Sequence, residues 1–115
     1  DARAAFDRLD TVHRDRLFNL HLHEHKVFRD DPGTWPFVMY EMERLRFYYS
    51  FWLTNPSDRD DPAYRAFQEV LATMPPIELK LRSGDALIID NHRMLHGRRA
   101  IGGEGDRYLE RFWIK

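Results

Sequence analysis

The sequence predicts an α+β fold in which helices flank a β-sheet. Residues 4–20 and 62–74 carry apolar side chains at the spacing of amphipathic helices. Four shorter segments have the alternating or continuous apolar patterns of strands. They are residues 45–53, 77–81, 86–90 and 107–114. Turn residues such as Asp30-Asp31-Pro32-Gly33 separate these elements.

The first helix and the first strand are predicted from periodicity. Phe6, Leu9, Leu17 and Leu20 recur at helical spacing, and charged residues fill the other faces. Residues 45–53 (LRFYYSFWL) are aromatic and end before Asn55-Pro56, which indicates a strand. On it, alternate residues share a face, so we expect a core side and a side with Tyr48 and Trp52 that could line a pocket.

The second helix has clear end signals. Asp61 suits the N-cap and Pro62 the first helical position, while Pro75-Pro76 ends the helix. Residues 77–81 then alternate, so one face of that strand is expected to be solvated. Ser83-Gly84-Asp85 predicts a tight turn, and residues 86–90 (ALIID) predict a strand buried on both faces.

Composition excludes several classes of protein. The chain has 115 residues, of which 43% are hydrophobic, so one domain with a real core is expected. A formal net charge of -1 gives no global attraction to nucleic acid or to an acidic membrane. No apolar run approaches the roughly 20 residues that span a bilayer. The absence of cysteine excludes disulfides and thiolate metal sites and is compatible with a cytoplasmic location.

The candidate chemistry lies at the C-terminal end. His96 follows a buried strand, where a neutral imidazole can be presented to a metal. Arg107 and Arg111 would share one face of the last strand, and guanidinium groups bind carboxylates bidentately. Spacing alone therefore suggests a metal with two carboxylate sites nearby. The alternative from the same residues is a structural histidine with arginines in ordinary salt bridges.

A longer run of matching positions indicates a family. Six features follow one another along the chain. They are a Gly-Asp turn, an apolar strand, Asp-Asn, an arginine two residues before a Leu-His-Gly-Arg sequence, a loop, and Arg-x-Leu. These positions are Gly84-Asp85, Asp90-Asn91, Arg93, His96-Gly97-Arg98, and Arg107 with Leu109. The run resembles the C-terminal signature of the taurine dioxygenase-like Fe(II)/2-oxoglutarate oxygenases, in the branch with clavaminate synthase and the amino-acid hydroxylases. The resemblance covers roughly residues 44–115.

The resemblance implies the C-terminal part of a double-stranded β-helix, or jelly roll, with flanking helices. Residues 44–115 would hold barrel strands with one helix, and residues 1–43 a helical insert or lid, within a single domain or fragment. His96 would be the distal histidine ligand of Fe(II), and Arg107 would hold the distal carboxylate of 2-oxoglutarate. Arg111 would contact an acidic group of the substrate or co-substrate. Arg93 and Arg98 would be structural and pair with Asp90 or backbone carbonyls.

The implied activity is hydroxylation of a small amino-acid-like or anionic substrate, with O2 and decarboxylation of 2-oxoglutarate to succinate. The family also needs a His-x-Asp/Glu dyad, and His13-Arg14-Asp15 alone fits that spacing. Because it falls within a predicted helix, we expect the dyad to lie upstream and the chain to be a C-terminal portion that is inactive by itself. The oligomeric state is left open.

Two further interpretations remain. A non-catalytic jelly-roll or cupin-like binding module would keep the fold without the metal. The residues His21-Leu22-His23-Glu24-His25 could be a solvated segment, an active-site lid or a zinc site, because three histidines share a face if the segment is a strand.

Overall fold

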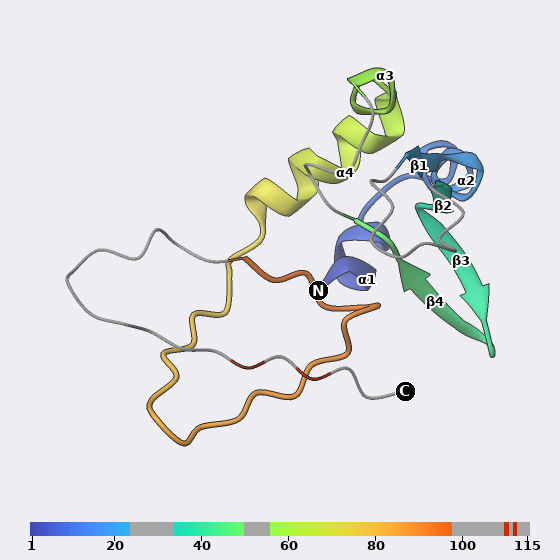
Figure 1. Ribbon diagram of the computed structural model, residues 1–115. Coiled ribbons are helices and arrows are strands. Elements are labelled where there is room, and N and C mark those ends of the chain that lie inside the picture. Colours follow the sequence, from blue (N-terminus) through green and yellow to red (C-terminus); the bar gives the residue numbers. More distant parts are fainter. Residues whose placement is uncertain (24–33, 50–55, 98–109, 111, 113–115) are drawn as a thin grey trace.

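The computed structural model describes residues 1–23, 34–49 and 56–97, together with residues 110 and 112. These parts form helices and small antiparallel sheets, which confirms the coarse prediction of a mixed helix-and-sheet fold. Strand β1 pairs with β2, and β3 with β4 (Figure 1). The elements in chain order are α1 (Ala2–Phe6), α2 (Thr11–Asn19), β1 (His21–His23), β2 (Thr34–Pro36), β3 (Val38–Glu41), β4 (Arg44–Phe47), α3 (Pro56–Arg59) and α4 (Pro62–Thr73).

The single helix predicted over residues 4–20 is wrong, because the chain forms two helices there. Asp10 is the reason for the break. Its backbone is extended (φ -69°, ψ 168°), and its side chain accepts a hydrogen bond from the His13 backbone N–H at 2.8 Å. A carboxylate that caps the N-terminus of α2 cannot also lie inside a continuous helix.

The second predicted helix is confirmed as α4. The Asp61 carboxylate accepts a hydrogen bond from the Ala63 N–H at 2.8 Å, and Pro62 occupies the first turn. Tyr64 and Phe67 on one face are fully buried. The sequence signals worked here because cap, proline and apolar stripe all indicate the same helix.

The β3–β4 hairpin covers only part of the strand predicted at residues 45–53. Strand β4 runs from Arg44 to Phe47, the two tyrosines that follow lie outside it, and residues 50–53 lie outside the described residues. The turn consists of Met42 and Glu43, with φ values of 48° and 63°. Positive φ at both positions is the type I′ geometry that matches the twist of a tight hairpin.

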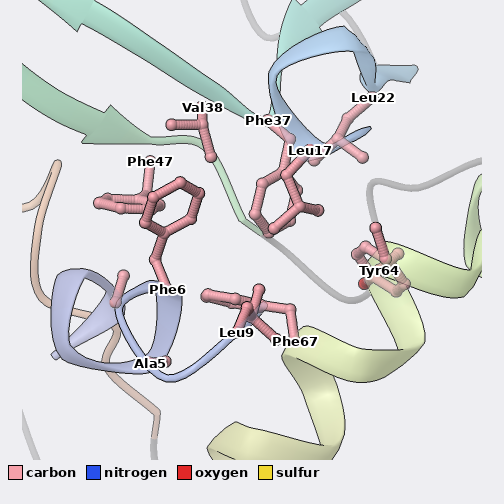
Figure 2. Close-up of a cluster of buried hydrophobic side chains, with 12 residues drawn as sticks. Ala5, Phe6, Leu9, Leu17, Leu22, Phe37, Val38, Phe47, Tyr64 and Phe67 are labelled. Carbon is pink, nitrogen blue, oxygen red and sulfur yellow. The ribbon is translucent and has the colours of Figure 1, made fainter. Parts of the chain in front are cut away.

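One hydrophobic core joins the helices to the hairpin (Figure 2). The Phe37 ring meets the rings of Tyr64 and Phe67 edge-on, with centroids 5.9 Å and 5.0 Å apart. Phe47 of β4 meets Phe6 of α1 in the same way at 5.6 Å. Residues from α1, α4 and β4 therefore share one apolar interior, as Figure 2 shows. The buried residues are Ala2, Ala5, Phe6, Leu9, Leu17, Leu22, Phe37, Val38, Phe47, Ala63, Tyr64 and Phe67.

The strands predicted at residues 77–81 and 86–90 are wrong. This part of the chain leaves α4 as a long loop without strand structure (Figure 1), and Ile88 in its middle is 84% exposed. A strand buried on both faces needs neighbouring strands and cover on each side, and no described residue supplies either. The turn between them is confirmed, since Gly84 has φ 90° and the Arg82 N–H donates to the Asp85 carboxylate at 2.7 Å.

The last predicted strand, residues 107–114, lies outside the described residues except for Glu110 and Phe112. Among the described helices, none combines the length and apolar character needed to cross a bilayer.

Candidate functional site

Residues 90–97, which we call the His96 segment, form a compact turn. The Asp90 carbonyl accepts hydrogen bonds from the backbone N–H groups of Arg93 and Met94 at 3.1 Å and 2.8 Å. The Asp90 side chain accepts from the His92 N–H at 3.0 Å. An aspartate that bonds to the backbone two residues on is the usual way to turn a chain sharply. The Asp-Asn pair read from the sequence therefore sets the local shape, and His96 lies exposed at the far end.

The His96 segment is attached to the hairpin through His92. Its carbonyl accepts a hydrogen bond from the Phe47 N–H at 2.8 Å, and its ring Nε2 lies 3.3 Å from Arg46 Nη1. The same imidazole meets the Tyr48 ring edge-on at 5.5 Å. Three consecutive residues of the aromatic segment thus contact one histidine.

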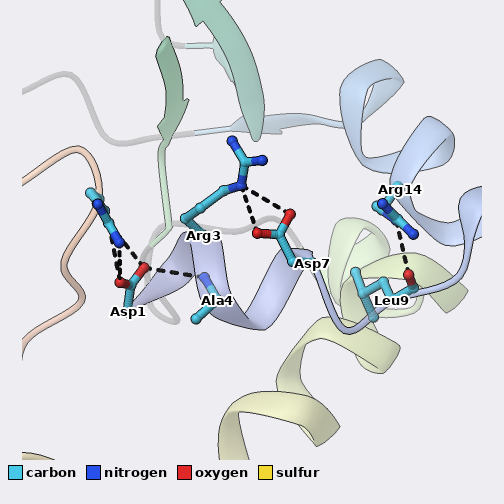
Figure 3. A network of polar contacts seen from close by, with 7 residues as sticks. Asp1, Arg3, Ala4, Asp7, Leu9 and Arg14 are labelled. Atoms are coloured by element: carbon cyan, nitrogen blue, oxygen red, sulfur yellow. Dashed lines mark hydrogen bonds and ion pairs between the residues drawn. The ribbon is translucent and has the colours of Figure 1, made fainter.

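A second attachment joins the segment to helix α1 (Figure 3). The Arg93 guanidinium donates to both carboxylate oxygens of Asp1, at distances from 2.7 to 3.2 Å, and the Ala2 N–H donates to the Arg93 carbonyl at 2.8 Å. Arg93 was expected to be structural and to pair with Asp90 or with backbone carbonyls, whereas its guanidinium pairs with Asp1. The Asp90 carboxylate instead accepts from the backbone of its own turn.

The other predicted site residues lie outside the described part of the chain. Arg98, Arg107 and Arg111 are not described, so their predicted roles stay predictions. His96 is described and solvent-exposed, next to a half-buried Leu95 that packs against the core.

The described residues do not assemble a complete metal site. Within them, no three His, Asp or Glu side chains gather closely enough to hold an ion. His13 bonds through Nδ1 to Asp10, the cap of its helix, at 2.9 Å, and His13, Asp15 and His96 do not gather into one metal-holding group. The donor chemistry therefore fits one position of a two-histidine, one-carboxylate iron site, namely His96, and not the whole set.

The histidine-rich stretch is only partly described. His21 contacts the carbonyl of Asn19 through Nδ1 at 3.2 Å and lies on the surface. The His23 side chain and His25 are outside the described residues, so neither a lid nor a zinc site is tested.

An open groove of about 470 Å³ lies between α2 and α4. Arg16 Nε donates across it to the Asp61 carboxylate at 2.8 Å, which is also the cap of α4. The groove contains Asp15 but not His96, so it gives no link between the two.

Comparison with known families decides the class. The family model described as "Taurine catabolism dioxygenase TauD, TfdA family" matches residues 1–113. The chain belongs to this family. Membership in the TauD, TfdA family places the chain in the superfamily of Fe(II)/2-oxoglutarate dioxygenases. No solved structure matches the chain.

The TauD family match is wider than the resemblance read from the sequence, since it includes residues 1–43 as well as 44–115. Dioxygenases of this family generally use Fe(II), 2-oxoglutarate and O2. Sequence reasoning missed the contacts that Asp1 makes with Arg93, and Arg46 with His92, of the His96 segment. A strand that carries Arg46 between apolar residues was a usable signal for Arg46, whereas nothing in the sequence pairs Asp1 with Arg93.

Proposed function

We propose that this chain is part of an Fe(II)/2-oxoglutarate-dependent dioxygenase that hydroxylates a small amino-acid-like or anionic substrate, and that His96 is one ligand of the iron. Family membership supports the class of reaction. The observation that carries the residue assignment is the matching run from Gly84-Asp85 to Arg107, with His96 held at the exposed end of a turn that is fixed at several points.

Each site residue has one task in this proposal. His96 donates an imidazole nitrogen to the metal, and Arg107 grips the distal carboxylate of 2-oxoglutarate through its planar guanidinium. Arg111 binds an acidic group on the substrate or co-substrate. The first histidine and the carboxylate of the iron site come from outside the described residues. When bound, the iron with 2-oxoglutarate and O2 supplies the oxidation of a substrate C–H bond, and 2-oxoglutarate leaves as succinate.

The wider setting is also a proposal. The fold completed by this chain is a jelly roll, with residues 44–115 in the barrel and residues 1–43 as a lid or insert. The protein acts in the cytoplasm on a small molecule and binds neither nucleic acid nor membranes.

Turnover tests the proposal. In the full-length protein, conversion of 2-oxoglutarate to succinate should vanish in His96→Ala and collapse in Arg107→Ala. Lys80→Ala, which removes an exposed side chain with no assigned role, is the control and should turn over as the wild type does. Turnover at the wild-type rate in both His96→Ala and Arg107→Ala would refute the assignment.

A second candidate is a non-catalytic jelly-roll or cupin-like binding module. The lack of a His-x-Asp/Glu dyad at the end of a predicted strand in this sequence motivates it. Calorimetry separates the two, because a dioxygenase binds 2-oxoglutarate only weakly without iron, whereas a metal-free module takes up no iron at all. A structural zinc site is a third, weaker candidate. Replacing His21, His23 and His25 together with no change in metal content or melting temperature would remove it.

A further inference from the structure

The His96 segment has no strand partner among the described residues, yet it lies at a defined place on the molecule. Its position comes from contacts made by residues far away in the sequence, in α1 and β4. These contacts surround the residues just before His96 and leave His96 itself exposed. That arrangement suits a side chain that must be presented to a ligand.

In the contact from α1, both partners, Asp1 and Arg93, make further hydrogen bonds. The Asp1 carboxylate caps α1 by accepting from the Ala4 N–H at 3.2 Å, so it is fixed to the helix (Figure 3). It receives Arg93 through both Nε and Nη2, and a guanidinium held bidentately has a fixed orientation as well as a fixed place. The neighbouring backbone bond from Ala2 to the Arg93 carbonyl holds the same residue on its main-chain side.

The contact from β4 joins the Arg46 guanidinium to the His92 ring. Arg46 can only donate hydrogen bonds, so Nε2 of His92 is the acceptor in this contact. The Arg46 guanidinium also pairs with Glu41 on the opposite strand of the hairpin. One side chain therefore ties the His96 segment to the hairpin.

Leu95 provides the third point of attachment, because its side chain packs against the hydrophobic core. Between His92 and Leu95 the backbone is thus held by α1, by β4 and by the core. Little freedom remains for the residue that follows.

We propose that Asp1 and Arg46 are positioning residues, which hold the His96 segment so that the His96 imidazole is presented at a fixed place. This inference rests on the proposed function, in which that imidazole binds a metal. Groups that bond directly to a metal ligand typically contribute about 10- to 100-fold to metal affinity. Asp1 and Arg46 act through Arg93 and His92, so the lower end of that range is expected.

The test uses Asp1→Asn and Arg46→Gln in the full-length protein. Asparagine can still cap α1, so Asp1→Asn removes the ion pair and not the cap. Arg3→Gln and Arg65→Gln are the matched controls, since each breaks an exposed Arg–Asp pair elsewhere, Arg3–Asp7 in α1 and Asp60–Arg65 at α4. Two quantities are measured for each protein: hydrogen exchange, without metal, of the Arg93 and Met94 amides, which bond to the Asp90 carbonyl, and the affinity for Co²⁺.

We expect both positioning variants to lose protection at the amides of Arg93 and Met94, and to bind Co²⁺ about 10-fold more weakly. The controls should match the wild type in both quantities. Arg93→Gln combined with Asp1→Asn should be no worse than either change alone, because both remove the same ion pair.

The outcomes are distinguishable. Unchanged hydrogen exchange in both variants overturns the positioning role. If His96→Ala abolishes Co²⁺ binding, then faster hydrogen exchange with unchanged Co²⁺ affinity in the variants also overturns it. If His96→Ala leaves Co²⁺ binding of the wild type intact, the proposed function fails. Hydrogen exchange alone then shows whether Asp1 and Arg46 hold the His96 segment in place.

Discussion

Asp10 and His13 face one another across the first turn of α2, and their contacts have a consequence for stability. A hydrogen bond from the His13 backbone N–H, followed by one from its ring, lowers the pKa of Asp10 from the ordinary value of 3.8. A carboxyl whose pKa is lowered in the folded state stabilises the fold while it is ionised. Its contribution is present above the unfolded pKa and is lost as the pH falls through the lowered folded value.

We therefore predict that part of the acid-induced loss of stability disappears in Asp10→Asn. This variant keeps a side-chain oxygen for the cap but does not titrate. His13→Ala should bring the pKa of Asp10 only partly back, because the backbone hydrogen bond remains. Melting temperatures between about pH 2.5 and pH 6 measure the effect, since this window extends below and above the ordinary carboxyl value. Identical pH profiles for the wild type and Asp10→Asn would contradict it.

Single residues also mark the limit of sequence reasoning at the candidate site. His96 could be singled out because a histidine, a glycine and an arginine stand in order after a strand-like run. Asp1 could not, because its partner Arg93 is 92 residues away and only the folded chain brings them together. Predicting long-range ion pairs requires knowing which elements pack, and local patterns do not contain that information.

Some helices and strands could be predicted from the sequence because residues within the element determine it, and others could not. Helix α4 was predicted correctly because its cap, its proline and its apolar stripe are all local signals. The segment at residues 77–90 was predicted wrongly because an apolar run shows only that burial is favourable, whereas a strand also needs a partner. The β3–β4 turn was missed for a third reason, since Met42 and Glu43 are not the Asn-Gly type of residues that signal a tight hairpin.

Two substitutions test the contrast between the buried helix α4 and the exposed segment at residues 77–90. Phe67 of α4 is fully buried among aromatic rings, so Phe67→Ala should lower the free energy of unfolding by about 3–5 kcal/mol. Ile88 is 84% exposed, so Ile88→Ser should change it by no more than about 0.5 kcal/mol. Urea denaturation of this 115-residue chain gives both values. If Ile88→Ser lowered the free energy of unfolding by several kcal/mol, Ile88 would be buried, as the sequence prediction of a strand requires.

The hairpin offers a substitution that stabilises. Left-handed backbone costs an ordinary residue roughly 1 kcal/mol or more, and asparagine and glycine bear that cost best. Met42→Asn together with Glu43→Gly should therefore raise the free energy of unfolding by about 1 kcal/mol. The conservative pair Met42→Leu and Glu43→Gln keeps the strain and serves as the control. No gain over that control would show that the turn is not strained.

At the scale of the whole molecule, the motif and the family match indicate the same class of protein. The ordered motif from Gly84 to Leu109 indicated the family, and the family match over residues 1–113 shows it. The fold was predicted only in outline, as helices with antiparallel sheet, because barrel closure depends on contacts between distant strands. Of the proposed site residues, the described part of the chain contains His96, together with the contacts that hold its segment.

Anaerobic calorimetry with Fe(II) and then 2-oxoglutarate tests most directly whether His96 binds the iron of a 2-oxoglutarate dioxygenase. The wild-type full-length protein should bind iron first and 2-oxoglutarate only afterwards. His96→Ala should lose iron affinity at least about 100-fold, since it removes a ligand and not merely a group that supports one. Arg107→Ala should keep its iron affinity and lose that for 2-oxoglutarate. Iron binding by His96→Ala that equals the wild type would contradict the assignment.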